Sequence, residues 1–214
     1  PNWSDIDFVT PHSDGSALKK EWKFNPSDRI IMYAGNIGYK QGLEIIFDAA
    51  EYFQEQTDIK FVLVGAGAYT TTLKELSAMR KLANVYFKPL QPWVNVPQML
   101  ALADIHLVVQ KKGAADAVLP SKLTNILSAG GHALVTAEPH TELGAIAAKH
   151  KGIFTCVAPE NPSAFIAGLT DLLAQDLATH NAVAREFAEL YLAKDKILDQ
   201  FVVDLENLIK KPKY

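Results

Sequence analysis

Short apolar runs alternate along the chain with longer segments in which hydrophobic residues recur every three or four positions. The short runs are apolar almost throughout, which is typical of strands that helices cover on both faces. The predicted strands are 30–34, 60–64, 84–87, 105–109, 133–136 and 152–156. The predicted helices between them are 43–53, 71–82, 96–103, 121–129 and 142–149. This alternation predicts an α/β fold with a doubly wound, Rossmann-like parallel sheet.

The two ends of the chain lack the alternation. Residues 1–28 carry three prolines and many polar residues without a sustained period, so we expect a linker that leads in from a preceding domain. Past Pro162 the pattern is wholly helical, and 191–214 predicts a helix with one strongly apolar face. That C-terminal helix either packs on this domain or crosses towards a neighbouring one. The nucleotide-binding domain itself is predicted to span 29–190.

Composition narrows the class of protein. The chain has 214 residues, 49% of them hydrophobic and 21% charged, which is enough for one substantial core. A net charge of −3 gives no sign of the excess of basic residues that binds nucleic acid. No apolar run reaches the roughly 18 residues of a membrane span. The single cysteine, Cys156, lies in an apolar run, so we expect a buried strand residue in a reducing cytoplasmic compartment.

The segment 118–130 is the most informative part of the sequence, because it predicts a loop that runs into a helix whose first turn carries Lys122. The helix dipole and the unpaired amide groups of a first turn disfavour a cation there by roughly a few tenths of a kcal/mol. An anion that bound the lysine and the amides together would remove that penalty. We therefore predict that Lys122 forms half of a diphosphate pocket.

A glycine-rich turn at 35–42 follows the first strand and is expected to lead into a helix that also opens on a lysine, Lys40. Glycines lack a β-carbon, so their backbone amides can approach a phosphate closely. The alternative is a tight turn with a solvated lysine. The candidate contacts in this turn are Gly35, Asn36, Gly38, Lys40 and Gln41.

Three further loops follow predicted strands. Residues 65–70 begin Gly-Ala-Gly, but Thr70 stands where a dinucleotide-binding loop needs its third glycine. The loop 88–93 holds two prolines and could present backbone groups to a base edge, although linker chemistry explains it equally well. The basic loop 110–113 could contact an anion or could simply be solvated.

Two histidines lie in or near predicted strands. His106 is expected to be a core or edge residue of its strand and not a catalyst. His132 falls beside two glycines at a strand start, on the side of the sheet opposite to the loops above, and we assign it no chemistry.

Taken together, these segments resemble the carboxy-terminal, donor-nucleotide-binding domain of GT-B glycosyltransferases of the family-4 type. The resemblance covers nearly the whole chain and is carried by 33–43, 61–67, 99–105 and 119–123. The subgroup that the chain most resembles is that of bacterial transferases of capsule, colanic-acid or O-antigen assembly. These share Pro-Ser-Lys, here at 120–122, where others have a Gly-Phe-Gly loop.

The resemblance implies a retaining, two-domain enzyme that transfers a sugar from a UDP- or GDP-sugar to a lipid-linked surface-polysaccharide acceptor at the inner face of the cell membrane. This chain would bind the donor without turnover, and a missing N-terminal domain would bind the acceptor and associate peripherally with the membrane. No metal, other cofactor or nucleic acid is expected. The catalytic residues are unknown, with Lys40 and Lys122 as candidate leaving-group stabilisers. The implied donor contacts are Gly35, Asn36, Gly38, Lys40, Gln41, Gly65, Gly67, Pro89, Leu90, Pro120, Ser121, Lys122, Leu123 and Asn125.

The chain departs from the family pattern at three places. The two carboxylates of the Glu-x7-Glu pair are replaced by Ala117 and Asn125, of which Asn125 can still hydrogen-bond a ribose. Asn36 replaces the usual arginine, and Lys40 lies one residue earlier than the usual lysine. Either other contacts bind the donor, or the catalytic groups come from the missing N-terminal domain.

Three alternatives therefore stay open. A GT-B-like nucleotide-sugar epimerase would need acidic and histidine side chains in the cleft, where only Asp116 is evident. A non-catalytic nucleotide-binding or partner-docking module would bind a sugar nucleotide without turnover. A dinucleotide oxidoreductase is poorly supported by the glycines.

Overall fold

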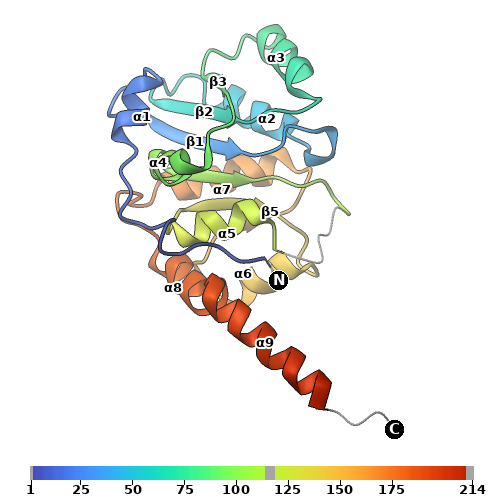
Figure 1. Ribbon diagram of the computed structural model, residues 1–214. Coiled ribbons are helices and arrows are strands. Elements are labelled where there is room, and N and C mark those ends of the chain that lie inside the picture. The colour runs from blue at the N-terminus through green and yellow to red at the C-terminus, as the bar shows by residue number, and fades with distance from the viewer. Residues whose placement is uncertain (1, 114–118, 211–214) are drawn as a thin grey trace.

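A computed structural model describes residues 2–113 and 119–210 of the chain, without the side chains of 205–210. Its centre is a six-stranded parallel sheet in the order β3-β2-β1-β4-β5-β6 (Figure 1). The strands are β1 (Arg29–Ala34), β2 (Ile59–Val64), β3 (Val85–Lys88), β4 (Ile105–Val108), β5 (Ala133–Thr136) and β6 (Thr155–Val157). This order reverses direction at β1 and β4, as in a doubly wound sheet, and confirms the predicted fold class.

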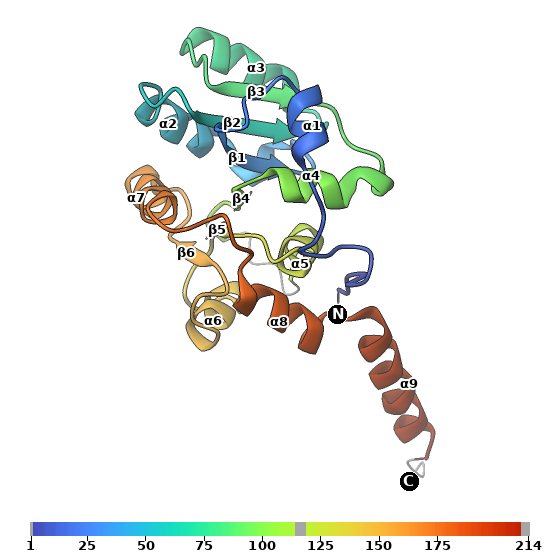
Figure 2. The same cartoon turned by 90° about the vertical axis from the view of Figure 1, so that its left-hand side faces the viewer.

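Helices cover both faces of the sheet. They are α1 (Ser16–Glu21), α2 (Glu44–Tyr52), α3 (Thr70–Met79), α4 (Val96–Leu102), α5 (Ser121–Ser128), α6 (Glu142–Lys149), α7 (Pro162–Leu173), α8 (Ala182–Tyr191) and α9 (Lys194–Lys210). Figure 2 shows α2 and α7 on one side of the sheet and α4 and α5 on the other. Two buried apolar clusters match these layers: one includes side chains of α2, α3 and α7, and the other includes side chains of α1, α4, α5 and α8.

The two helices α7 and α8 begin at residues that favour the start of a helix. The Asn161 side chain accepts a 3.0 Å hydrogen bond from the amide of Ala164, and Pro162 occupies the first helical position of α7. The Asn181 side chain accepts the equivalent bond from Ala184 at the start of α8. Asparagine caps and an N-terminal proline satisfy or avoid amide groups that have no partner inside a helix. No helix in the described part of the chain has the length and hydropathy of a membrane span.

The structure corrects several predicted elements. Lys40 does not open a helix: Tyr39–Gln41 form a short 3₁₀ turn, η1, and α2 begins later at Glu44. Gly42 separates the two with a left-handed φ of 69°, which interrupts helical geometry. The last strand lies at 155–157 instead of 152–156. Helices α1 and α8 were not predicted as separate elements.

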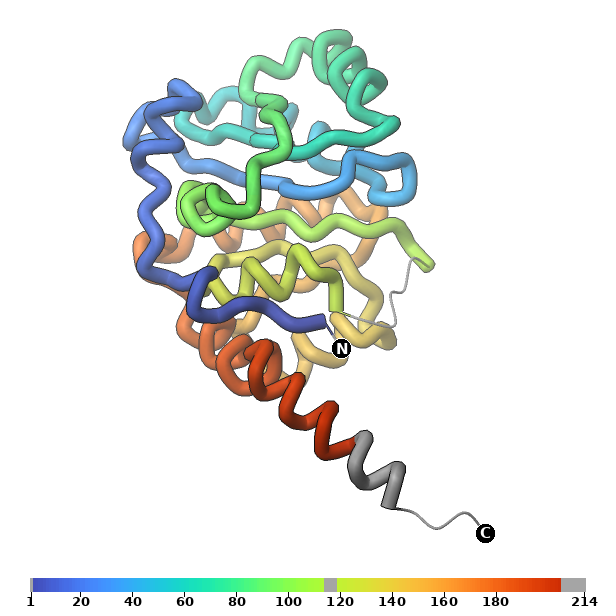
Figure 3. Tube along the Cα trace, viewed as in Figure 1, coloured from blue at the N-terminus to red at the C-terminus, as the bar shows by residue number. Residues whose placement is uncertain are grey.

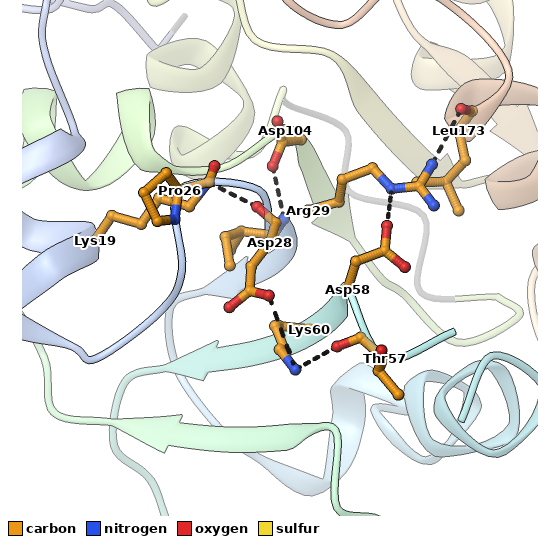
Figure 4. Close-up of polar contacts among 10 residues, drawn as sticks. Lys19, Pro26, Asp28, Arg29, Thr57, Asp58, Lys60, Asp104 and Leu173 are labelled. Atoms are coloured by element: carbon orange, nitrogen blue, oxygen red, sulfur yellow. Dashed lines mark hydrogen bonds and ion pairs between the residues drawn. The ribbon is translucent and has the colours of Figure 1, made fainter. Parts of the chain in front are cut away.

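The amino ends of β1 and β2 are held by charged side chains (Figure 4). The Arg29 guanidinium donates to Asp58 at 2.8 Å, and the Asp104 carboxylate accepts from the amide of Ile30 at 2.6 Å. Lys19 donates to the carbonyl oxygens of Pro26 and Asp28 at 3.0 and 2.6 Å. These contacts fix the edge of the sheet that lies away from the strand carboxyl ends.

The first described residues of the chain lie at the opposite end of the strands, next to the start of α5 and the end of α8 (Figure 3). Asn2 donates to the carbonyl of Leu119 at 2.7 Å, just before α5. The buried Ser4 donates its amide to the carbonyl of Leu192 at 2.9 Å, where α8 ends. Helix α9 then runs away from the rest of the structure. The division into 1–28, 29–190 and 191–214 stays a prediction.

Candidate functional site

A cavity of about 150 Å³ lies at the carboxyl ends of β1 and β2, between the sheet and helices α4 and α5. We call it the carboxyl-edge cavity. Ligands of doubly wound sheets bind at this edge, outside the point where the strand order reverses. Its lining residues are Met32, Ala34, Gly35, Val64, Leu90, Gln91, Val96, Met99, Leu100, His106, Lys122, Asn125 and Ile126.

Lys122 brings a cation to this cavity from the first turn of α5, as the sequence predicts. Pro120 caps the helix with an extended backbone, and no acidic residue lies in the first turn. Exposed Ser121 and buried Leu123 flank the lysine. Lys122 itself is half-buried, and its ammonium group donates to the hydroxyl of Tyr33 at 2.9 Å. The cation is therefore held beside the sheet.

Tyr33 is fully buried in β1 and was not among the predicted site residues. Its hydroxyl donates to the carbonyl oxygen of Asn36 at 2.7 Å. Burial raises the pKa of this phenol well above its usual range, so the side chain is neutral. One buried hydroxyl thus joins the glycine turn after β1 to the lysine of α5.

The glycine loops after β1 and β2 pack directly against each other. The amides of Gly35 and Ile37 donate to the carbonyls of Val64 and Ala66 at 2.9 and 3.0 Å. A β-carbon on Gly65 would lie 1.9 Å from the Gly35 carbonyl oxygen, and one on Gly67 would lie 2.1 Å from that of Ile37. The loop contact therefore requires glycine at both positions. Neither Gly65 nor Gly67 lines the cavity, and their contact with a donor stays a prediction.

The remaining predicted residues of the first turn lie outside the cavity lining. Lys40 and Asn36 are exposed, while Gly38 and Gln41 are half-buried. The Oε1 atom of Gln41 is buried without a hydrogen-bond partner among the described residues. The structure thus places Lys122 at the cavity, while Lys40 is exposed and outside the cavity lining.

The loop after β3 forms another part of the cavity wall. Leu90 and Gln91 line it, and the Gln91 amide group donates to the carbonyl of Pro89 at 3.0 Å. Leu90 is 68% exposed, so it presents an apolar surface that a ligand could cover. The Trp93 ring stacks on Phe8, with ring centroids 5.3 Å apart. The N-terminal segment thereby supports this loop.

Asn125 lines the cavity one turn after Lys122, and its Oδ1 atom accepts a 2.9 Å hydrogen bond from the Ser4 hydroxyl. An amide oxygen can accept a second hydrogen bond and the amide nitrogen can donate, and the contact of Asn125 with a ribose stays a prediction. Ala117, the other position of the replaced carboxylate pair, lies outside the described residues, as does Asp116.

His106 forms part of the cavity floor and is 2% exposed. Burial, with a smaller effect of His132, lowers the pKa of His106 to about 4, although a hydrogen bond at Leu100 opposes this. Its Nε2 atom has no hydrogen-bond partner among the described residues. His106 is a core histidine, as predicted, and its place in the cavity was missed. The signal in the sequence is one polar residue within an otherwise apolar strand.

The cavity combines one ammonium group, a glycine turn and apolar walls of Val96, Met99 and Leu100. An anionic group could meet the lysine and the first amides of α5, while a flat apolar group could lie against the walls. In residues 2–113 and 119–210 no three His, Cys, Asp or Glu side chains come together as metal ligands.

Comparison with known proteins gives consistent relatives. The family described as "Glycosyl transferases group 1" matches residues 15–189. A protein of Escherichia coli K12 named as a colanic acid biosynthesis glycosyl transferase, WcaI, is 45% identical over 209 residues, which are 97% of this chain and 51% of that protein. The chain thus spans about half the length of this curated relative.

Solved structures share the fold at low sequence identity. Anabaena Alr3699/HepE, solved with UDP and glucose, superposes with a TM-score of 0.79 at 17% identity, over 96% of this chain and 55% of that one. The C-terminal domain of LpcC from Francisella tularensis, a glycosyl transferase group 1 family protein, superposes with a TM-score of 0.70 at 14% identity. That match covers 89% of this chain and 99% of the other.

Proposed function

The chain belongs to the group 1 glycosyl transferase family, and from this membership we propose that it is the donor-binding half of a retaining glycosyltransferase. The donor would be a nucleoside-diphosphate sugar, and the acceptor a lipid-linked precursor of a surface polysaccharide. The WcaI relative is named for colanic acid biosynthesis, and the Anabaena relative was solved with UDP and with UDP-glucose. Both support this choice of substrates.

The observation that carries the proposal is the position of Lys122 in the carboxyl-edge cavity. Lys122 lines this cavity together with Gly35, Leu90 and Gln91. We propose that the diphosphate meets Lys122 and the amides at the start of α5, while the base and ribose lie towards the loop after β3. A fixed cation there would stabilise the charge that develops on the leaving diphosphate.

The acceptor site and the catalytic base would come from the other half of the protein. The chain covers 51% of the WcaI relative, so half of a protein of that length lies outside it. We propose that this other half brings the lipid-linked acceptor to the cavity at the cytoplasmic membrane face. The 214-residue chain alone should bind the donor without transferring sugar.

The epimerase alternative is less well supported. It needs acid and base groups that can exchange protons near neutral pH. Among the cavity-lining residues, the ionisable side chains are Lys122 and His106. The lowered pKa of His106 keeps its ring neutral at pH 7. The glycine loops do not support the oxidoreductase alternative, because Gly65 and Gly67 are already required for the close contact between the loops after β1 and β2.

The test is calorimetric titration of the chain with UDP, GDP, ADP and NAD, each with and without magnesium. We expect metal-independent binding of one nucleoside diphosphate. Lys122→Ala should weaken it by about 1.5–3 kcal/mol, or roughly 10- to 150-fold, because a charge-assisted contact is lost. Lys40→Ala should cost less, because Lys40 is exposed outside the cavity. Lys151→Ala, at an exposed lysine in the turn before β6, is the matched control.

The outcomes separate the alternatives. Binding that survives Lys122→Ala unchanged would refute the cavity as the diphosphate site. NAD binding would favour the oxidoreductase. Sugar transfer by these 214 residues alone would show that the acceptor site and base are not in the other half.

A further inference from the structure

We propose that Tyr33 is a positioning residue for the donor diphosphate, which holds the Lys122 ammonium group in its binding position. This inference rests on the proposed function and deepens it. Tyr33 would not touch the substrate. It would act through Lys122, 89 residues away in sequence, which it meets only because β1 and α5 are neighbours in the fold.

The two hydrogen bonds of Tyr33 fix the direction of each proton. The hydroxyl has one proton, and it is donated to the carbonyl of Asn36 at 2.7 Å. The oxygen must therefore accept from Lys122, whose Nζ lies 2.9 Å away. An ammonium group can only donate, so this arrangement has one consistent orientation.

The ring adds a second contact to the same nitrogen. Lys122 Nζ lies 4.3 Å from the centroid of the Tyr33 ring, within the range of a cation–π interaction. The ring itself cannot move far, because Tyr33 is fully buried and its strand pairs with both neighbours, β2 and β4. A flexible lysine side chain is thus held by a rigid one.

This partner restrains the lysine without contributing a negative charge. A buried phenol stays neutral at physiological pH, so Tyr33 itself does not neutralise the charge of Lys122. Gly35 keeps the space open, because a β-carbon there would lie 3.1 Å from Nζ. Holding a long side chain in place before binding reduces the entropy lost when the ligand arrives.

The rival explanation is that Tyr33 is only a core residue, and that its hydrogen bonds merely satisfy a buried hydroxyl group. Both explanations allow Tyr33→Phe to change stability, because the Asn36 carbonyl loses its donor. They differ in what happens to the ligand: a positioning role weakens contact with phosphate through Lys122, while a purely structural role affects all parts of the ligand alike.

The experiment titrates parent, Tyr33→Phe, Lys122→Ala and the double variant with UDP, GDP and ADP, and then with the nucleoside of whichever diphosphate binds. Tyr33→Phe should weaken diphosphate binding roughly two- to tenfold. It should leave nucleoside binding unchanged, and it should cost nothing further in the Lys122→Ala background. Tyr86→Phe, at a half-buried tyrosine of β3, is the matched control for the fold.

Each result decides the matter. Equal diphosphate affinity of parent and Tyr33→Phe would overturn the positioning role while leaving the proposed function intact. Equal losses for nucleoside and diphosphate, or a loss that adds to that of Lys122→Ala, would identify a structural role. A parent chain that binds none of the three diphosphates would overturn the proposed function, and the positioning role with it.

Discussion

His106 shows how one buried side chain can make the stability of the whole chain depend on pH. Its imidazole is 2% exposed in the carboxyl-edge cavity, and burial lowers its pKa to about 4. Between pH 6.5 and 4 the unfolded chain binds a proton at this residue and the folded chain does not. The stability from the neutral ring is therefore complete above pH 6.5 and is lost as the pH falls towards 4.

The corresponding prediction concerns His106→Gln. Because each pKa unit corresponds to about 1.4 kcal/mol, we expect the variant to lose roughly 3 kcal/mol less unfolding free energy than the parent between pH 7 and pH 4. Urea unfolding at a series of pH values measures this difference. His12→Gln, at an exposed position, should retain the parent's pH dependence. If the unfolding free energy of parent and His106→Gln falls equally between pH 7 and pH 4, another group controls the loss of stability in acid.

At the scale of elements, the amino edge of the sheet depends on Asp104. Its carboxylate accepts from the amide of Ile30, a fully buried residue of β1 (Figure 4). We predict that Asp104→Ala destabilises the fold by about 1–3 kcal/mol, because it leaves that buried amide without its partner. Thermal or urea unfolding measures the loss.

Asp58→Ala provides the control at the same edge. The Asp58 and Arg29 side chains are 45% and 35% exposed, so their ion pair should contribute less than about 1 kcal/mol. Both variants should bind a nucleoside diphosphate as the parent does, because they act at the edge opposite the carboxyl-edge cavity. An Asp104→Ala chain as stable as Asp58→Ala would mean that water satisfies the Ile30 amide.

The elements that the sequence predicts well are those whose signal is local. All six strands were predicted, because buried parallel strands are apolar runs bounded by polar loops. Helix α5 was predicted from its start at Pro120 and Ser121. Helix α1 was missed because its six residues include one buried side chain, Leu18, which is too little for a periodic pattern.

The parts of the site that were missed depend on contacts between distant segments. Tyr33 and His106 look like ordinary strand residues until the sheet brings them to Lys122 and to the cavity floor. Lys40 and Lys122 look alike in sequence, since both follow a loop after a strand. The structure separates them: Lys40 is exposed, whereas Lys122 is half-buried with its ammonium group against a tyrosine of β1.

At the scale of the whole molecule, α9 is the element least attached to the rest. It runs away from the body of the structure, and its side chains Leu198, Phe201 and Val202 are between 42% and 56% exposed. Apolar surface on a projecting helix is typical of a face that another domain or chain covers. In this chain alone, that face contributes little to folding.

The prediction at this scale compares two phenylalanines. Phe201→Ser should change the unfolding free energy by less than about 0.5 kcal/mol, because its side chain is already 56% exposed. Phe187→Ala, at a buried position of α8, should cost roughly 3–5 kcal/mol. Urea unfolding of both variants tests this. A large loss for Phe201→Ser would show that α9 packs on the chain's own body.

A methyl group at position 65 would collide with the Gly35 carbonyl oxygen whether or not a nucleotide is present. Natural selection for folding alone should therefore preserve that glycine, even in a lineage that no longer binds the proposed donor. The Tyr33 hydroxyl and the Lys122 ammonium have no such protection, because a descendant could replace them with apolar groups and still fold. We expect relatives that still fold but no longer bind the donor to keep the glycines and to vary at positions 33 and 122.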